Sequence, residues 1–267
     1  MKPAAREKAV NIHTTAIVHP KAKIAEGVEI GPYTVIGEHV SIGRDTKIGS
    51  HALIEGWTTI GERNHIHAFT SIGTPPQDIS YKPNEQTYVI IGDDNVIREY
   101  ATVHRATTKA DRKTEIGNRN FLMSYIHVAH DCKLGNNIIM ANNAAFGGHV
   151  IVEDYALLGA IVGIHQFVRV GAYSMIGGQS AIVLDVPPYV NATGNRAQLY
   201  GLNTIGLKRK GFTDEVISNL KKAYKIIFRS GLTQEEAFRT ALQEFPDSKE
   251  VNYFVDFMRH SKRGVTR

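Results

Sequence analysis

Isoleucine recurs at every sixth position along the first quarter of this chain. The positions are Ile24, Ile30, Ile36, Ile42, Ile48, Ile54, Ile60, Ile66 and Ile72. A period of six matches neither an amphipathic helix nor one face of a single strand. It is typical of a solenoid with short rungs, in which each hexad forms a flat strand and a tight corner. The β-branched side chains would fill the interior, and the glycine that follows most of them would tolerate the bend.

The hexad register continues after two interruptions. Apolar residues keep the period from Ile91 to Val103 and again from Ile116 to Ile182, and the phase slips by one residue between blocks. The interrupting segments 74–88 and 105–114 are rich in turn-forming and charged residues, so we expect them to be loops ejected from the coil. If three hexads close one turn, the repeat supplies roughly nine or ten turns, stacked about 4.8 Å apart.

The pattern changes near the C-terminus. We assign residues 1–190 to the solenoid and 191–212 to a linker, and we expect an α-helical domain over 213–267. Thr213 precedes two acidic residues, Thr233 and Glu236 have the spacing of a capping box, and Ser248 stands two residues after Pro246, which predicts three helix starts. A bundle of this size is marginal alone, so it should pack on the solenoid or on another subunit.

Charge and cysteine content limit the class of protein. The net charge is +5, and residues 203–267 carry 13 Lys and Arg against 8 Asp and Glu, so the basicity belongs to the tail. This is either a solvated surface or a landing site for an acidic partner or phosphates. No nucleic-acid motif is present, so we expect no nucleic-acid partner. A single cysteine, no apolar run of membrane-span length and no signal-peptide core predict a cytoplasmic protein without an integral membrane segment.

Four histidines follow one column of the repeat. Val128, Phe146 and Ile164 are eighteen residues apart, so they should stack on successive turns. The histidines beside this column are His127, His130, His149 and His165. Three interpretations remain open: ordinary surface polarity, a metal site, or acid–base chemistry in which a neutral imidazole takes a proton from an alcohol.

Two neighbouring features bear on the acid–base interpretation. Asp131 could orient His130, but adjacent strand residues point to opposite faces, so this depends on the local turn. Gly147 and Gly148 precede His149 and would leave backbone amides approachable.

Several motifs, spread over nearly the whole chain, together indicate a protein family. They are His127-Val-Ala-His130-Asp131-Cys132, Ala141-Asn142-Asn143, Gly148-His149-Val150, Gly163-Ile164-His165-Gln166-Phe167, Asp185-Val-Pro-Pro-Tyr189 and Gly206-Leu-Lys-Arg209-Lys210-Gly-Phe212. This combination resembles the acyl-[acyl-carrier-protein]–UDP-N-acetylglucosamine O-acyltransferase family. The resemblance implies a mainly β fold, a left-handed parallel β-helix followed by a small α-helical domain. It also implies a homotrimer with active sites between neighbouring subunits, and neither a cofactor nor a metal.

The resemblance further implies a reaction and a set of roles. An (R)-3-hydroxyacyl group would pass from acyl carrier protein to the 3-hydroxyl of UDP-N-acetylglucosamine, the first acylation of lipid A biosynthesis. His130 would be the general base, Asp131 its support and the Gly148 amide the oxyanion donor, with no acyl-enzyme at Cys132. The expected substrate-binding residues are Gln77, Asp78, His127, His149, His165, Gln166, Gly178, Asn203, Arg209 and Lys210.

The chain departs from the family pattern at three positions. Ser80 stands where a lysine is common, Arg196 where a histidine is common, and Ile205 where an acidic residue is familiar. These departures put the nucleotide contacts in question and leave a 3-amino sugar acceptor open. The other functions to be weighed are a related hexapeptide N-acyltransferase, which should carry a different N-terminal domain, a carbonic anhydrase with histidine-bound zinc, and a non-catalytic scaffold.

Overall fold

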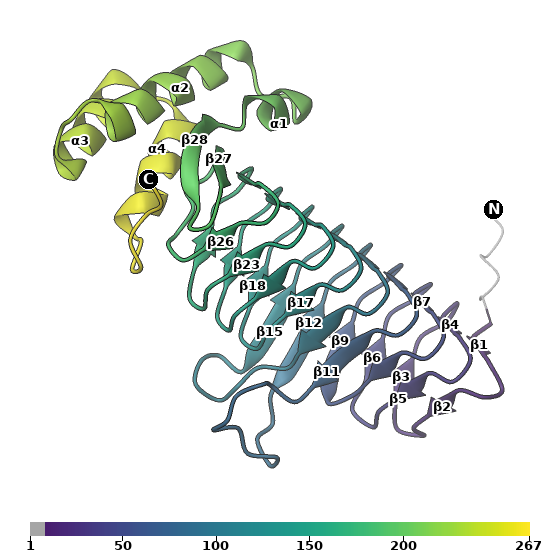
Figure 1. Ribbon diagram of the computed structural model, residues 1–267. Coiled ribbons are helices and arrows are strands. Elements are labelled where there is room, and N and C mark those ends of the chain that lie inside the picture. The colour runs from purple at the N-terminus through teal and green to yellow at the C-terminus, as the bar shows by residue number, and fades with distance from the viewer. Residues whose placement is uncertain (1–8) are drawn as a thin grey trace, which may run out of the picture.

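Three parallel sheets form the walls of a long prism, and helices cover its C-terminal end (Figure 1). The computed structural model describes residues 9–267. Asn11 pairs with Glu29 and Ile12 with Ile30, so one turn of the coil contains eighteen residues. The predicted hexad geometry is therefore present. Residues 1–8 lie outside the described residues. They form most of the N-terminal segment in which we expected no signal peptide.

Most strands contain only two residues, as a six-residue rung requires. The first sheet contains, in order, β1 (Asn11–Ile12), β4 (Glu29–Ile30), β7 (Lys47–Ile48), β10 (His65–Ile66), β13 (Val96–Ile97), β16 (Phe121–Leu122), β19 (Ile139–Met140), β22 (Leu157–Leu158), β25 (Met175–Ile176), β27 (Val190–Thr193) and β28 (Gln198–Leu202). The second contains β2 (Ile17–Val18), β5 (Val35–Ile36), β8 (Leu53–Ile54), β11 (Ser71–Thr74), β14 (Thr102–His104), β17 (His127–Val128), β20 (Ala145–Phe146), β23 (Gly163–Ile164) and β26 (Ala181–Ile182). The third contains β3 (Lys23–Ile24), β6 (Ser41–Ile42), β9 (Trp57–Ile60), β12 (Tyr88–Ile91), β15 (Lys113–Ile116), β18 (Lys133–Leu134), β21 (Ile151–Val152) and β24 (Arg169–Val170).

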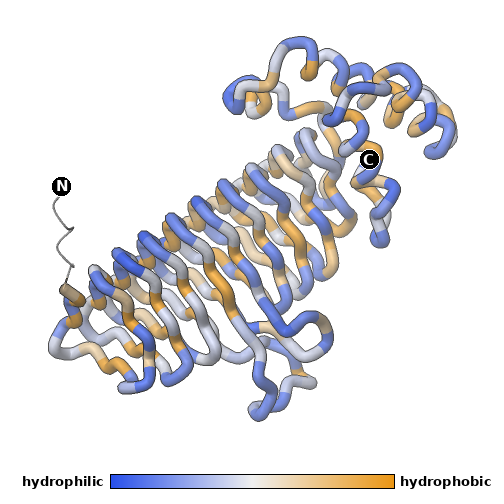
Figure 2. Tube along the Cα trace, turned by 180° about the vertical axis from the view of Figure 1, so that it is seen from behind, coloured by the Kyte–Doolittle hydropathy of each residue, from blue (hydrophilic) through white to orange (hydrophobic). Residues whose placement is uncertain are grey.

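The repeating isoleucines fill the interior of the prism. Ile36, Ile54 and Ile72 stack in the second sheet and are at most 1% exposed. Figure 2 shows hydrophobic segments alternating with hydrophilic ones along the coil. Burying one such side chain stabilises the fold by about 2 kcal/mol, so the stacked isoleucines stabilise the coil at every turn.

Both expected loops leave the coil and return to it without changing the register. The first lies between β11 and β12, and the second between β14 and β15. Ile66 pairs with Ile97 across the first loop, and Val103 pairs with Val128 across the second. Strand β15 begins at Lys113, just inside the range that we expected for the second loop. The strand columns are therefore continuous above and below the loops.

The two loops project from the same side of the prism and are bonded to each other (Figure 1). Lys109 Nζ lies 2.6 Å from Asp78 Oδ2. The buried Arg105 guanidinium donates to the carbonyl of Gly73 and to the hydroxyl of Tyr81. These contacts make the loops one connected unit.

The segment 191–212, which we expected to be a linker, contains regular structure. Strand β27 pairs in parallel with β25 and extends the first sheet, and β28 returns antiparallel to it. Helix α1 (Thr204–Arg209) follows. The hexad pattern ends before this hairpin, yet Val190 and Ala192 are buried, because β27 continues the wall with strands of another length. Apolar periodicity alone therefore did not reveal it.

Three further helices follow, with the predicted caps. They are α2 (Asp214–Arg229), α3 (Gln234–Glu244) and α4 (Lys249–Arg259). Their N-caps are Thr213, Thr233 and Ser248, and Thr233 forms the capping box with Glu236. No helix within residues 9–267 is long and apolar enough to cross a bilayer.

The helical region packs on the end of the solenoid, one of the two arrangements that we expected. The Tyr253 hydroxyl on α4 donates to the Glu153 carboxylate. The Arg169 guanidinium lies over the ring of Phe257, 4.3 Å from its centroid. After α4, the Ser261 hydroxyl donates to Asp185, a buried carboxylate in the last turn of the coil. The tail therefore closes one wall of the cavity described below.

Candidate active site

Three consecutive corners between the second and third sheets carry the candidate catalytic residues. Asp131, His149 and Phe167 occupy the same position on successive turns, with φ values of 60°, 61° and 66°. His130 and Gly148 stand one residue earlier on the first two of these turns. The repeat therefore places side chains from separate motifs next to one another, as the eighteen-residue column predicted.

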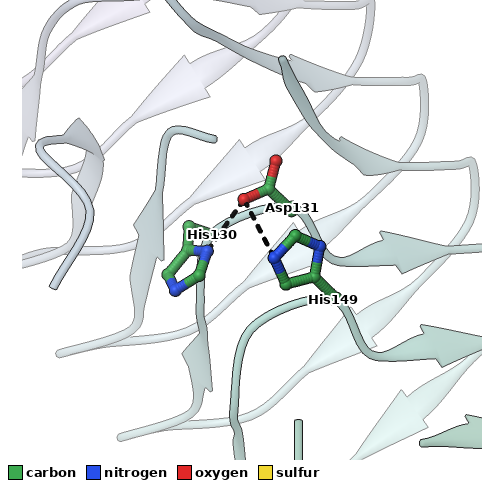
Figure 3. Close-up of side chains that lie close together, drawn as sticks. All are labelled: His130, Asp131 and His149. Carbon is green, nitrogen blue, oxygen red and sulfur yellow. Dashed lines mark hydrogen bonds and ion pairs between the residues drawn. The ribbon is translucent and has the colours of Figure 1, made fainter. Parts of the chain in front are cut away.

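His130 and Asp131 form a hydrogen-bonded pair. His130 Nδ1 lies 2.8 Å from Asp131 Oδ2, and His149 Nε2 lies 3.6 Å from the same oxygen (Figure 3). An ionised carboxylate can only accept, so Nδ1 of His130 carries a proton, and Nε2 is the nitrogen with the lone pair in the neutral ring. The left-handed backbone of Asp131 turns the carboxylate back toward its neighbour, so the condition set by the local turn is met.

The Asp131 carboxylate is held by the second ejected loop. The side chain is fully buried, and Thr107 donates to Oδ2 through its backbone N–H at 3.1 Å and its hydroxyl at 2.8 Å. Burial alone would raise the pKa of Asp131, but the hydrogen bonds from His130 and Thr107 outweigh it and lower the pKa. The carboxylate therefore stays ionised and keeps the imidazole in one tautomer.

Gly148 lies against the His130 ring. A Cβ at this position would come 2.3 Å from Cε1 and 2.7 Å from Nε2 of His130. Such distances are far inside van der Waals contact, so only glycine allows the ring to occupy this place. Within residues 9–267 no acceptor is bonded to the Gly148 N–H, which leaves the amide free beside the imidazole.

His127 occupies the rung of His130 and adjoins another histidine. Its Nδ1 lies 2.7 Å from the hydroxyl of Thr102, and its ring meets the ring of His104 edge-on at 5.1 Å. Burial, followed by the nearby His104 and His130, lowers the pKa of His127 to about 4. Burial also lowers the pKa of His104. Both rings are therefore neutral at physiological pH.

His104 was missed by the sequence reasoning. It lies on β14, one turn below His127, because Thr102 pairs with His127. The second ejected loop lies between the two and hides this relationship in the sequence. Continuing the Val103 and Val128 column across the loop would have found it.

His149 stands one turn above Asp131, beside the pair. Its ring meets His130 edge-on at 5.4 Å and stacks on Phe167 at 4.5 Å. Burial lowers the pKa of His149, against the opposing effect of Asp131. His165 and Gln166, one turn higher, are exposed, and His165 Nδ1 lies 3.1 Å from the Gln166 carbonyl oxygen.

A cavity of about 450 Å³ opens beside this cluster. Asp131, His149 and Phe167 line it on the solenoid side. Lys262 and Arg263, which follow α4, line it on the other. A molecule in this space would contact Asp131 and His149 on one side and the cationic side chains of Lys262 and Arg263 on the other, whereas His130 is not among the lining residues.

His130, Asp131 and His149 are also the described residues that could hold a metal ion. Two ligand atoms on one tetrahedral zinc lie about 3.3 Å apart, given zinc–nitrogen bonds of about 2.0 Å. His130 Nδ1 and Asp131 Oδ2 are closer than this, and the oxygen already accepts two hydrogen bonds from Thr107. The geometry is that of a charge-assisted hydrogen bond.

Asp78, in the first ejected loop, is tightly bonded within the chain. Oδ1 accepts from the backbone N–H and the hydroxyl of Ser80, each at 2.8 Å, and Oδ2 pairs with Lys109. These contacts, with Lys109 the largest cause, lower the pKa of Asp78. Lys109 thus brings an ammonium group to Asp78, although Ser80 stands at the position where the resemblance suggested a lysine. Gln77 is exposed.

The expected nucleotide-binding residues lie at the end of the prism. Asn203 caps α1 by accepting from the Gly206 N–H, and it donates to the Tyr173 carbonyl. Lys210 Nζ lies 4.7 Å from the centroid of Tyr155, and Arg209 is exposed.

Gly178 is exposed at a different corner, between β25 and β26. Ile205 and Arg196 are exposed as well. Within residues 9–267 no hydrogen bond or ion pair joins Gly178, Arg209 or Lys210 to the histidine pair.

Comparisons with known proteins show which proteins this chain resembles. The family model described as UDP N-acetylglucosamine O-acyltransferase, domain 2, matches residues 185–266, and the bacterial transferase hexapeptide model (six repeats) matches residues 39–74. The acyl-[acyl-carrier-protein]–UDP-N-acetylglucosamine O-acyltransferase of Thermodesulfovibrio yellowstonii is 54% identical, covering 96% of this chain and 99% of that protein. The enzyme of the same name from Syntrophobacter fumaroxidans is 52% identical, covering 97% and 100%.

A solved structure shows the same fold. The UDP-N-acetylglucosamine acyltransferase of Francisella novicida matches with a TM-score of 0.93 at 43% identity, covering 96% of this chain and 94% of that one. This match and the hexapeptide repeats confirm the expected left-handed parallel β-helix followed by helices. Identity above half over nearly the whole length decides the family. The chain therefore belongs to the acyl-[acyl-carrier-protein]–UDP-N-acetylglucosamine O-acyltransferase family.

Proposed function

We propose that this protein transfers an (R)-3-hydroxyacyl group from acyl carrier protein to the 3-hydroxyl of UDP-N-acetylglucosamine, the first step of lipid A biosynthesis. The observation that carries the proposal is the His130–Asp131 pair set against the free amide of Gly148. Family membership supplies the substrates, and the site supplies a base and an anion-stabilising donor in the same place.

In the proposed mechanism His130 is the general base. Its Nε2 takes the proton of the sugar hydroxyl as the oxygen attacks the thioester carbonyl. Negative charge grows on the carbonyl oxygen, where the Gly148 N–H donates a hydrogen bond. The tetrahedral intermediate then expels the thiolate of the carrier, which receives the proton from the imidazolium. The products are the acylated sugar nucleotide and the free thiol, so protons and bonds balance.

Asp131 stabilises the imidazolium that forms in this step. The carboxylate faces Nδ1, so positive charge on the ring is offset as the proton arrives at Nε2. Cys132 takes no part in the proposed reaction. It is buried, and burial raises the pKa of its thiol to about 12, so the thiolate needed for an acyl-enzyme is disfavoured.

We further propose that the remaining expected residues bind the substrates. They are Gln77, Asp78, His127, His149, His165, Gln166, Gly178, Asn203, Arg209 and Lys210. Gly178, Arg209 and Lys210 make no hydrogen bond or ion pair with His130 or Asp131 within the described chain, and we propose a homotrimer whose sites lie between neighbouring subunits. Arg209 and Lys210 carry charge suited to a diphosphate. An exposed glycine at 178 leaves room for a longer acyl chain. The proposed compartment is the cytoplasm.

The test is incubation of the purified protein with acyl carrier proteins of several chain lengths and either UDP-N-acetylglucosamine or its 3-amino analogue. Mass spectrometry of the sugar nucleotide identifies the acceptor. Acyl transfer to the 3-hydroxyl sugar is the expected result. Transfer only to the amine would correct the acceptor and point to Ser80, Arg196 and Ile205 as the cause. Transfer to neither sugar would contradict the proposed function.

A further inference from the structure

All the described contacts of the Asp131 carboxylate are made by one of its two oxygens, Oδ2. Asp131 Oδ2 receives hydrogen bonds from His130 Nδ1 and from the backbone and hydroxyl of Thr107, and His149 Nε2 lies 3.6 Å away. Asp131 Oδ1 is buried without a partner within the described residues. The two oxygens are chemically equal, so the hydrogen bond to His130 depends on the orientation of the carboxylate plane and not on which oxygen accepts it.

Thr107 is placed to fix the orientation of the Asp131 carboxylate. The torsion that exchanges the two carboxylate oxygens is broad and weakly restrained in a free side chain. Thr107 is 2% exposed and donates twice to Oδ2, at 3.1 and 2.8 Å. These two bonds oppose rotation of the carboxylate, and they come from the ejected loop and not from the coil that carries Asp131.

The loop that carries Thr107 is itself held in place. The backbone N–H of Lys109 donates to Thr107 Oγ1 at 3.2 Å, and Lys109 Nζ pairs with Asp78 Oδ2 at 2.6 Å. Hydrogen bonds therefore join the Lys109 side chain to Asp78 in the first loop, and the Lys109 backbone through Thr107 to Asp131 and His130.

We propose that Thr107 is a positioning residue of the transfer reaction, which fixes the Asp131 carboxylate so that it holds the His130 imidazole in its reactive orientation. This inference rests on the proposed function. Thr107 touches neither the base nor, in the proposed mechanism, the reacting atoms. It acts through Asp131, and the link from Lys109 to Asp78 keeps it in place.

The test compares Thr107→Val, which keeps the shape and loses the hydroxyl, with Thr107→Ser, which keeps the hydroxyl. Thr108→Val is the matched control, because the Thr108 side chain makes no hydrogen bond within residues 9–267. We expect Thr107→Val to lower kcat about 10- to 100-fold, the effect of one hydrogen bond to a charged group, with KM for both substrates nearly unchanged. Thr107→Ser should recover most of the rate, and Thr108→Val should match the wild type.

A double-mutant cycle decides whether Thr107 acts through Asp131. In an Asp131→Ala background the acceptor is gone, so adding Thr107→Val should change kcat by less than about twofold. A full additional loss there would overturn the inference. So would wild-type kcat in Thr107→Val, or a Thr107→Ser variant as slow as Thr107→Val. If Thr107→Val does not assemble as the wild type does on size exclusion, Thr107→Ala is judged by the same criteria. A wild-type protein that transfers to no acceptor would instead overturn the proposed function, and this inference with it.

Discussion

The α-carbon of Gly148 and the imidazole of His130 are in such close contact that a single methyl group cannot fit between them. The ideal Cβ position of residue 148 lies 2.3 Å from His130 Cε1 and 2.7 Å from Nε2. The glycine is therefore required by the ring on the turn below, as well as by any oxyanion that its amide receives. Both demands fall on one residue because the two corners stack directly in the coil.

Gly148→Ala should lower kcat/KM by about 10²- to 10³-fold, because the methyl group displaces His130, the proposed base, and the amide proposed to stabilise the anion moves with the backbone. Steady-state transfer kinetics measure the effect. The control is Gly163→Ala on β23, where an added Cβ meets nothing within 4 Å. That variant should keep wild-type kinetics. An active Gly148→Ala enzyme would show that the ring is not held where the structure places it.

His130→Ala should fold, assemble as the wild type does and lose nearly all transfer activity, because nothing else in the cluster holds a free Nε2 at this position. A positioned base contributes about 10²- to 10⁴-fold, so the residual rate should lie in that range below wild type. His13→Ala, at an exposed histidine near the start of the coil, is the control. Wild-type turnover by His130→Ala would remove this residue from the role of base.

Acid should destabilise the fold through His127. Burial and the nearby histidines lower its folded-state pKa to about 4, whereas an unfolded histidine has a pKa near 6.5. The unfolded state therefore binds the proton first, so the stabilising contribution is complete above about pH 6.5 and is lost as the pH falls toward 4. Urea unfolding at about pH 7 and about pH 5 measures the difference. His127→Asn should reduce it, and His13→Asn should leave it unchanged. An equal pH dependence in both variants would contradict the assignment.

Arg209→Ala should weaken binding of the sugar nucleotide more than it slows the bound complex. A guanidinium bonded to a diphosphate contributes about 1.5–3 kcal/mol, so KM for the nucleotide should rise about tenfold or more while kcat changes little. Arg229→Ala, at another exposed arginine at the end of α2, is the matched control. If KM is the same in both variants, Arg209 does not bind the diphosphate.

The sequence predicted the coil because its signal is local and repeated. Each isoleucine of the hexads meets the same environment, so the burial of Ile36 and Ile72 could be predicted without knowing any distant contact. The same register predicted that His130 and His149 would be neighbours. It could not predict His104 without crossing a loop of unknown path. Nor could it predict the bond between Asp131 and His130, which depends on the left-handed backbone of one corner residue.

The contacts that the two loops make were even harder to predict from the sequence. Thr107 and Asp131 are on different segments, and nothing in the spacing of the loop indicates that it folds back over the coil. Lys109 and Asp78 are joined by an ion pair between two segments that have no periodicity at all. The hairpin of β27 and β28 was hidden for a related reason, since its longer strands no longer follow the hexad.

The shared backbone of Asp131, His149 and Phe167 has an evolutionary consequence. Each of these residues has the same left-handed backbone conformation, one turn of the coil above the previous one. A point substitution at one of these corners therefore changes a side chain that lines the cavity while the backbone geometry of the corner can stay the same. A new specificity can arise on such a ladder by point substitution alone, without any insertion or rearrangement of the chain.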